Sequence, residues 1–341
     1  MVIENLYGYR PKCIIFYAIG GGGDIVSATL LAEKFKEIRV VLVTPVWERF
    51  RRDQVPGPVR FEELHGIRLY EYTAEPLYRC YANRAGRFFV PTACAVKKHV
   101  DRPLYFVDLY RGEVGVRLGL EEVASLHGCE AVLGVDVGGD ILAYGCEETL
   151  WSPLADNIGL SAIVNTDLDP VIAIYSPGSD GELPIETIEE RVAEISRQGG
   201  YLGALGIMRN DVYFLERILS DEDIATEAGR IALLAIKGFY GDRKIRNGSR
   251  VVRVSFIQAL IIFLDAYSMY RFLPIPKIIE DTTSLEEASR RLLDRGIYNE
   301  YQLEIDLSLN FMSRTGRIPP PEEVVRIREK HRASLPPCNP G

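Results

Sequence analysis

The stretch Cys13–Phe35, CIIFYAIGGGGDIVSATLLAEKF, decides the expected fold of this chain. Its first six residues, Cys13–Ala18, are apolar or aromatic, as in a strand that is buried on both faces. Four consecutive glycines and Asp24 follow. From Ile25 to Lys36, apolar residues recur at helical spacing. The stretch therefore predicts a buried strand, a glycine turn and an amphipathic helix.

A second buried strand is predicted at Arg39–Val43 (RVVLV). A strand, a helix and a second strand this close together form a βαβ unit with parallel strands and a right-handed crossover. Two later stretches repeat the order of strand, glycine and aspartate, namely Ala131–Ile141 (AVLGVDVGGDI) and Val171–Leu183 (VIAIYSPGSDGEL). We therefore predict an α/β fold, a Rossmann-like three-layer sandwich around a mainly parallel sheet.

Two parts of the chain are expected. Residues 1–205 form the Rossmann-like core that carries the glycine and aspartate loops. Residues 206–341 form a mostly helical portion that packs on the same core. In this second part, Val251–Phe263 is strongly apolar, and its periodicity leaves strand and helix open.

Further elements are predicted after residue 206, among them a helix from Thr283 or Ser284 to about Arg295 and a charged terminal helix, Glu322–His331. Val212–Leu219 and Asp221–Gly238 are expected to form a pair of helices, with Asp221 as the N-cap of the second. Leu303–Leu309 is expected to form a last strand.

Composition limits the classes of ligand. The chain has 341 residues, is 47% hydrophobic and carries a formal net charge of −8, which argues against a general nucleic-acid binder. The longest apolar segment, Val254–Leu264, is too short to span a bilayer, and the first residues do not resemble a secretory signal. We expect a cytoplasmic protein without a nucleic-acid or membrane partner, whose ligand is a small-molecule anion or a nucleotide. Homo-oligomer formation stays open.

The six cysteines include no CxxC pair, and no cysteine and histidine have the spacing of a zinc site. Cys13 and Cys129 are expected in the core. Glutamine is rare while arginine, glutamate and isoleucine are plentiful, a composition typical of thermophiles. Disulfides would be compatible with the cytoplasm of such an organism, whereas a mesophile would keep these cysteines reduced.

The glycine turn predicts a phosphate-binding loop. Glycines at the carboxyl end of a parallel strand let the backbone approach a ligand, and the following helix presents free N–H groups to an anion. The expected ligand-binding residues of this loop are Gly20, Gly21, Gly22 and Gly23. Asp24 has two interpretations. It could cap its own helix, or it could serve as a general base, a magnesium ligand or an acceptor for a ribose hydroxyl.

The loop does not match two familiar nucleotide-binding motifs. GxGxxG would need a third glycine at position 25, where Ile25 stands, and GxxxxGK[ST] would need a Lys followed by Ser or Thr. A glycine loop with an aspartate at the start of a helix is physically analogous to the anion hole of ribokinase-like sugar kinases. In those enzymes, however, the loop lies late in the chain.

The second turn predicts a metal or substrate site. Asp136 and Asp140 flank Val137-Gly138-Gly139, and two carboxylates in one tight turn suit Mg²⁺, which takes one or two carboxylates together with phosphates and water. The alternative is that one aspartate caps the next helix and the other accepts backbone hydrogen bonds in the turn. The further candidates for contact with the ligand are Gly138, Gly139, Ser152, Asp156, Asn157 and Asp180.

Taken together, the glycine loop, the turn at 134–140 (GVDVGGD) and the segment 152–157 (SPLADN) resemble an archaeal family catalogued only as a domain of unknown function. The resemblance covers most of the chain, to about Asn310. It implies a cytoplasmic archaeal protein and implies no activity, substrate or catalytic residue. The turn at 134–140 is also similar to the Gly-Asp-Gly-Gly-Asn turn of D-glutamate cyclases, although Asp140 replaces the asparagine.

Three functions remain open from the sequence. The first is an enzyme that acts on a phosphorylated or nucleotide-like molecule with Mg²⁺, in which Asp24, Asp136 and Asp140 are catalytic and converge on one cleft. The second is a non-catalytic nucleotide or metabolite sensor. The third is a cyclase or lyase that acts on a carboxylate substrate. Phosphotransfer or phosphate-ester chemistry is favoured over oxidoreduction, because the dinucleotide fingerprint is absent.

Overall fold

The computed structural model describes residues 2–341 and has the expected α/β architecture. Ten of its strands form one sheet in the order β3-β4-β6-β2-β1-β7-β8-β12-β9, with β5 paired to β4, and two form a separate hairpin. The strands are β1 (Cys13–Ala18), β2 (Arg39–Pro45), β3 (Leu64–Leu69), β4 (Thr73–Arg84), β5 (Arg87–Phe89), β6 (Leu104–Val107), β7 (Ala131–Val137), β8 (Asp169–Tyr175), β9 (Tyr201–Gly206), β10 (Gly241–Ile245), β11 (Arg250–Val254) and β12 (Leu260–Asp265).

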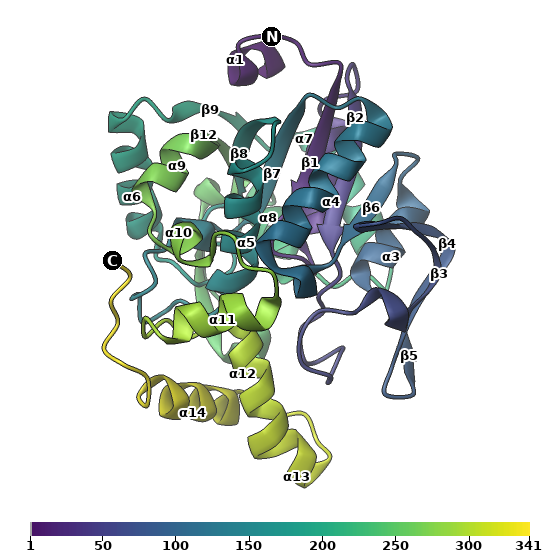
Figure 1. Ribbon diagram of the computed structural model, residues 1–341. Coiled ribbons are helices and arrows are strands. Elements are labelled where there is room, and N and C mark those ends of the chain that lie inside the picture. The colour runs from purple at the N-terminus through teal and green to yellow at the C-terminus, as the bar shows by residue number, and fades with distance from the viewer. Residues whose placement is uncertain (1) are drawn as a thin grey trace.

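Helices cover both faces of this sheet (Figure 1). They are α1 (Val2–Tyr7), α2 (Asp24–Glu33), α3 (Thr92–Val96), α4 (Gly112–His127), α5 (Pro153–Val164), α6 (Ile185–Arg197), α7 (Arg209–Leu219), α8 (Glu227–Ile236), α9 (Ala266–Phe272), α10 (Ile275–Ile279), α11 (Leu285–Leu293), α12 (Glu300–Leu307), α13 (Ser313–Thr315) and α14 (Pro321–Arg332).

The centre of the sheet is parallel. Strands β6, β2, β1, β7 and β8 pair in parallel, and the antiparallel pairs lie toward the two edges. In chain order these five strands have the arrangement 3-2-1-4-5. The direction of winding therefore reverses between β1 and β7, and ligands of such sheets bind beyond the strand ends at this switch point.

The alternation of side chains along β1 explains why its sequence is apolar throughout. Ile14 and Phe16 belong to one apolar core, with residues of α2, α3, α7 and α8. Ile15 and Tyr17 belong to a second core on the other face, with residues of α4, α5, α6 and α9–α11. The sheet therefore separates two helical layers, which confirms the three-layer arrangement.

Three sequence expectations need correction or completion. Asp221 does not cap a helix, because α8 begins at Glu227 and its N-cap is Thr226, whose hydroxyl accepts the N–H of Gly229 at 3.0 Å. Leu303–Leu309 is not a strand, because Leu303 lies within helix α12. The open segment 251–263 contains most of β11, a short 3₁₀ turn and the first part of β12.

The predicted boundary at residue 205 falls within β9. Beyond it, β12 returns to the sheet and pairs with both β8 and β9. The division into two parts stays a prediction.

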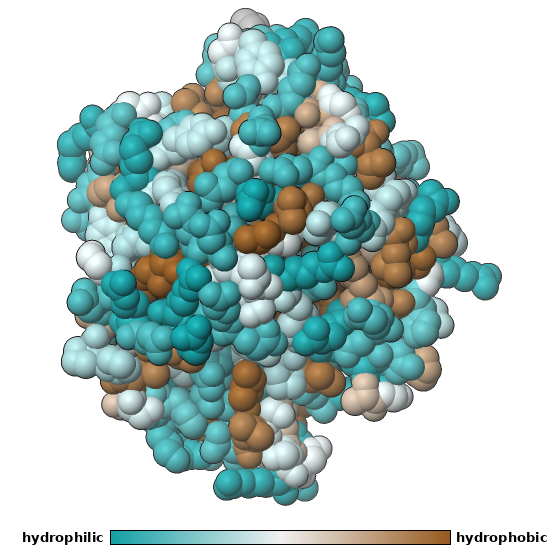
Figure 2. All heavy atoms as spheres, in the orientation of Figure 1, coloured by the Kyte–Doolittle hydropathy of each residue, from teal (hydrophilic) through white to brown (hydrophobic). Residues whose placement is uncertain are grey.

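Figure 2 shows one face of the molecule, which is mostly hydrophilic and carries separate small apolar patches. No helix among residues 2–341 is long and apolar enough to cross a membrane.

Candidate functional site

A cavity of about 400 Å³ lies beyond the ends of β1, β7 and β8, at the switch point of the sheet. The glycine loop before α2 forms one wall of it. The other walls come from the segments that follow β2, β7 and β8, from the start of α8, from the hairpin β10–β11, and from α12 and α14. Segments distant in the sequence therefore meet here.

Three aspartates converge at the glycine loop, and we call them the acidic trio: Asp24, Asp136 and Asp156. Each contributes one carboxylate oxygen to a group in which all oxygens lie within 4.8 Å of one another. Asp24 is the first residue of α2, and it does not cap that helix because Gly23 is in the N-cap position. Its Oδ2 instead accepts the N–H of Gly20 at 3.0 Å. Asp24 thus faces the other two carboxylates.

The acidic trio has little internal compensation for its charge. Asp136 is 1% exposed, and the partner of its carboxylate among the described residues is another carboxyl group, that of Asp140; Oδ1 of Asp156 is without a partner there. Burial and the neighbouring carboxylates raise the pKa of Asp136 and of Asp156 well above the usual range. Burial also raises the pKa of Asp24 to about 7, against the opposing charge of Arg49. Buried carboxylates without donors are costly, and a divalent cation would compensate them.

Gly20 leaves the space that this arrangement needs. A Cβ atom at this position would lie 2.6 Å from Oδ2 of Asp24 and 2.7 Å from Oδ1 of Asp156. Any side chain at residue 20 would therefore displace two members of the acidic trio.

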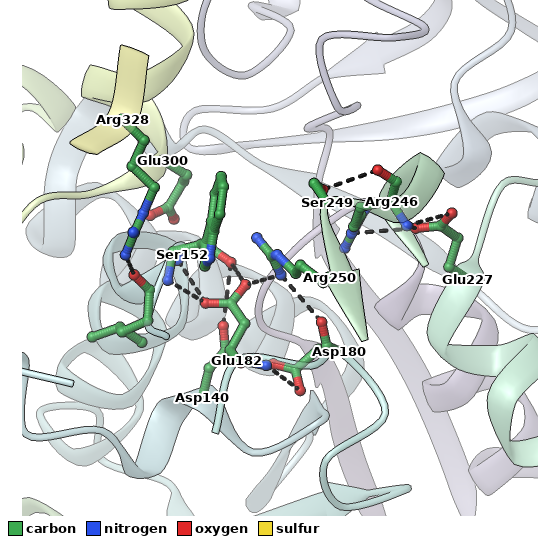
Figure 3. A network of polar contacts seen from close by, with 12 residues as sticks. Asp140, Ser152, Asp180, Glu182, Glu227, Arg246, Ser249, Arg250, Glu300 and Arg328 are labelled. Atoms are coloured by element: carbon green, nitrogen blue, oxygen red, sulfur yellow. Dashed lines mark hydrogen bonds and ion pairs between the residues drawn. The ribbon is translucent and has the colours of Figure 1, made fainter. Parts of the chain in front are cut away.

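A second acidic cluster, formed by Asp140, Asp180 and Glu182, has a different character. Glu182 accepts the N–H groups of Trp151 and Ser152 at 2.7 and 2.8 Å, and Arg250 donates to it at 2.6 Å. In Figure 3, Glu182 lies between Ser152 and Arg250. Burial raises the pKa of Glu182, but Arg250 and Ser152 outweigh burial and bring the pKa to about 2. Glu182 is therefore already satisfied and joins the hairpin to the start of α5.

Arginines form a cationic side of the cavity. The guanidinium group of Arg49 forms no hydrogen bond or ion pair with the rest of the described chain, although it lines the cavity. Burial lowers its pKa, and Glu182, Glu300 and Glu304 outweigh that effect and raise it. Burial and the charges of Arg49 and Arg250 lower the pKa of Arg246 to about 10. An anion between Arg49 and Arg246 would relieve their repulsion.

The structure brings most of the predicted site residues to this cavity. The residues that line it are Gly20, Gly21, Gly22, Gly23, Asp24, Asp140, Ser152, Asp156 and Asp180. The three aspartates that the sequence grouped together lie in two neighbouring clusters, since Asp24 and Asp136 belong to the acidic trio and Asp140 to the second cluster, and the carboxyl groups of Asp136 and Asp140 contact each other.

Four predicted residues lie behind the cavity wall. Asp136 is at the base of the acidic trio. Asn157 is fully buried and donates to the carbonyl of Pro153 at 2.8 Å. Gly138 and Gly139 are buried in the turn after β7. At Gly138 φ is +115°, and a Cβ atom there would meet Cγ of Asp180 at 2.2 Å, so this glycine permits the close approach of two loops.

Among the charged residues of the site that sequence reasoning missed are Arg49, Glu182, Arg246, Arg250, Glu300 and Glu304. Two of them could have been found, because Arg49 and Glu182 follow β2 and β8 at the sheet edge where ligands bind. Glu300 accepts the N–H groups of Leu154 and Ala155 at 3.0 and 2.8 Å and so caps α5 from a distant part of the chain. No local sequence pattern indicates such a contact, because its partners are far apart in the chain.

Comparison with known proteins gives one match. The family model described as "Protein of unknown function (DUF1152)" matches residues 15–308. No curated protein matches the chain significantly. No solved structure does so either. The matched range contains the glycine loop, all members of the acidic trio and the arginine side of the cavity. The chain therefore belongs to the DUF1152 family, whose function is unknown.

Proposed function

We propose that this protein is an enzyme that acts on a phosphorylated or nucleotide-like small molecule with the help of Mg²⁺. The observation that carries the proposal is the acidic trio, and above all Asp136, whose buried carboxylate has no donor within the described chain other than the neighbouring carboxyl group of Asp140. Mg²⁺ is bound in proteins by one or two carboxylates together with phosphate oxygens and water. Asp24 and Asp156 line the cavity, so the acidic trio is open to a ligand on that side, which suits such coordination.

The glycine loop supports a phosphate as the second partner. The N–H groups of Gly21, Gly22 and Gly23 donate no hydrogen bond within residues 2–341, and they stand at the N-terminus of α2. Free amides and the partial positive charge of a helix N-terminus attract phosphates. Arg49 and Arg246 add cationic groups on the cavity wall. One ligand could therefore contact a cation at the acidic trio and the amides and arginines around it.

This combination favours phosphoryl-transfer or phosphate-ester chemistry. Such reactions depend mainly on positioning and on neutralising charge at the phosphoryl oxygens, and metal ions, arginines and backbone amides provide both. We also propose a cytoplasmic location in a thermophilic archaeon. Three cysteine pairs lie at disulfide bonding distance, and intracellular disulfides are compatible with such an organism.

The test is calorimetry and phosphate release on wild-type protein and on Asp136→Asn. Without ligands, Asp136→Asn should be the more stable protein, because the change removes one of several mutually repelling buried carboxylates. Wild type should gain stability from MgCl₂ with ATP or pyrophosphate, by about 2.7 kcal/mol at a hundredfold excess over Kd. Asp136→Asn should lose that gain and should release phosphate at least 100-fold more slowly.

The matched control is Asp108→Asn. Asp108 also ends a strand of the sheet, but its Oδ1 accepts the N–H of Tyr110 at 2.9 Å, and it does not line the cavity. This variant should respond to Mg²⁺ and nucleotide like wild type. Stabilisation without turnover would support a sensor instead, and an unchanged response of Asp136→Asn to Mg²⁺ would reject the proposed cation site.

A further inference from the structure

The cavity has an apolar side as well as its charged one. Phe50, Leu303 and Val324 line it, and Pro319 and Pro321 complete the same surface. Leu303 and Val324 are 6% and 5% exposed and belong to one apolar cluster, on which Phe50 packs. These residues come from the segment after β2, from α12, and from α14 with the turn before it. Three separate parts of the chain thus build one apolar wall, which we define by Phe50, Leu303 and Val324.

The apolar wall is part of the same cavity as the acidic trio. Trp151 connects the two sides, since it lines the cavity and also belongs to the apolar cluster. The guanidinium carbons of Arg250 and Arg328 lie 4.7 and 4.4 Å from the centre of its ring. Trp151 is held at its backbone N–H by Glu182. Trp151, which separates the charged side of the cavity from the apolar wall, is therefore held in place by Glu182, Arg250 and Arg328.

A cavity of about 400 Å³ is in the size range of whole small-molecule sites, which is much more than a phosphate group needs. Such sites combine apolar walls with a few convergent polar groups that fix orientation. A bare anion such as pyrophosphate would leave the parts of Phe50, Leu303 and Val324 that face the cavity in contact with water. Apolar surface of this kind contributes affinity only when a ligand covers it.

We infer that the ligand is amphipathic, with a phosphate or diphosphate at the acidic trio and an apolar or aromatic group against Phe50, Leu303 and Val324. This inference rests on the proposed function and adds the class of substrate to it. Two sources share the chemistry, namely an alkyl diphosphate, whose chain would lie along the wall, and a nucleotide, whose base would stack on Phe50.

The experiment measures Kd by calorimetry on the full chain in saturating MgCl₂, for pyrophosphate, for a ten-carbon alkyl diphosphate and for ADP. At least one of the two amphipathic probes should bind tenfold or more tightly than pyrophosphate. The probe that gains affinity identifies the source of the apolar group. Equal affinities for all three probes would overturn the inference.

Three variants locate the effect on the wall. Phe50→Ala and Leu303→Ala should each reduce the advantage of the amphipathic probe by tenfold or more and should change the affinity for pyrophosphate by less than threefold. Leu309→Ala is the control, since Leu309 is 62% exposed and does not line the cavity. Phe50 is only half-buried in a loop, so its variant should fold even if Leu303→Ala does not.

The outcomes separate this inference from the proposed function. If pyrophosphate fails to bind in the presence of Mg²⁺, the proposed function is wrong and the inference falls with it. If pyrophosphate binds and the two wall variants weaken all three probes equally, the wall does not recognise the ligand, and only the inference is wrong.

Discussion

At Glu304, the polar contacts of one buried side chain lead to a measurable pH dependence. Glu304 is 4% exposed, and its Oε2 accepts the indole N–H of Trp47 at 3.1 Å and the N–H of Gly57 at 2.8 Å. Burial raises the pKa of Glu304 from 4.5 to about 7, although these donors and the charge of Arg49 oppose the rise. Between pH 4.5 and 7 the folded protein therefore holds a proton that the unfolded chain releases.

The sign of the effect follows from linkage. Where the native state binds more protons, the free energy of unfolding falls as pH rises, so the contribution of Glu304 is fully present below pH 4.5 and is lost by about pH 7. At about 1.4 kcal/mol for each pH unit, the full loss is about 3 kcal/mol. Glu304→Gln cannot ionise and keeps a carbonyl oxygen for both donors. It should match wild type at pH 4 and exceed it by up to about 3 kcal/mol at pH 8.

The measurement is urea unfolding of both proteins at several pH values without ligand. Glu222→Gln is a suitable control, because Glu222 is exposed and should give the same pH profile as wild type. A constant difference between Glu304→Gln and wild type across this pH range would contradict a raised pKa at Glu304.

Individual residues of the site differ in how far sequence could predict them. Asp24 and Asp156 follow local rules, since glycines and carboxylates at strand ends and helix starts gather at one sheet edge. The alternative for Asp24, a helix cap, could not be excluded without the position of Gly20, whose N–H Asp24 accepts. Arg246 gives no local signal, because only the fold of the hairpin brings it to the cavity.

Among the elements, the hairpin β10–β11 contributes one buried ion pair to the loop after β8. Arg250 and Glu182 have side chains that are 9% and 1% exposed and lie 2.6 Å apart. Removing one partner of such a pair leaves a buried charge without compensation, which costs about 3–5 kcal/mol. Arg250→Met should therefore destabilise the protein by about 3 kcal/mol. Adding Glu182→Gln to that variant should restore part of the loss, because the carboxylate that lost its partner is then neutral as well.

A double-mutant cycle from urea unfolding measures this coupling. The same hairpin offers a matched control, since Arg253 pairs with Asp242 at 3.0 Å while both side chains are more than half exposed. Exposed pairs contribute little, so Arg253→Met should change the free energy of unfolding by less than about 1 kcal/mol. A larger effect at Arg253 than at Arg250 would show that the hairpin is not held through Glu182.

The elements that sequence misassigned have a common cause. Leu303–Leu309 alternates apolar and polar residues as a strand would, yet the buried polar side chains Glu300 and Glu304 occupy one turn of α12. Periodicity assumes that polar residues face water, and here they face a cavity and the start of α5. The predicted cap at Asp221 failed for a related reason, because its carboxylate instead accepts the N–H of Asp223 at 3.0 Å and lies 2.8 Å from Nε2 of His99, which is distant in the sequence.

At the scale of the whole molecule, the parallel pairs β1–β2 and β7–β8 could be predicted because each belongs to a βαβ unit that is local in sequence. The position of β12 could not, since it returns after an excursion of more than fifty residues to lie between β8 and β9. The apolar wall of the cavity likewise depends on segments that are distant in the sequence. Helices α11–α14 gather at one end of the sheet (Figure 1), and α12 and α14 place Leu303 and Val324 beside the loops of the first half.

The disulfide Cys146–Cys338 fastens this last part of the chain to the core. Both cysteines are exposed, whereas the four cysteines of the other two pairs are each less than 9% exposed. Mild reduction should therefore open this bond first. It closes a loop of 192 residues, and the loss of that constraint costs at most about 5 kcal/mol in the chain-entropy model.

Cys338→Ser should lower the unfolding temperature by several degrees under non-reducing conditions, and dithiothreitol should bring wild type down to the same value. The variant itself should not respond to the reductant at a concentration that leaves the two buried pairs intact, as alkylation and mass measurement would verify.

Arg332 donates to the carbonyl of Glu148 at 2.9 Å and would still hold α14 in part. Because α14 carries Val324, Cys338→Ser should also bind an amphipathic probe more weakly than wild type does, by a larger factor than for pyrophosphate. Equal unfolding temperatures for the two oxidised proteins would mean that the ion pairs and apolar contacts of α14 hold the wall without the disulfide.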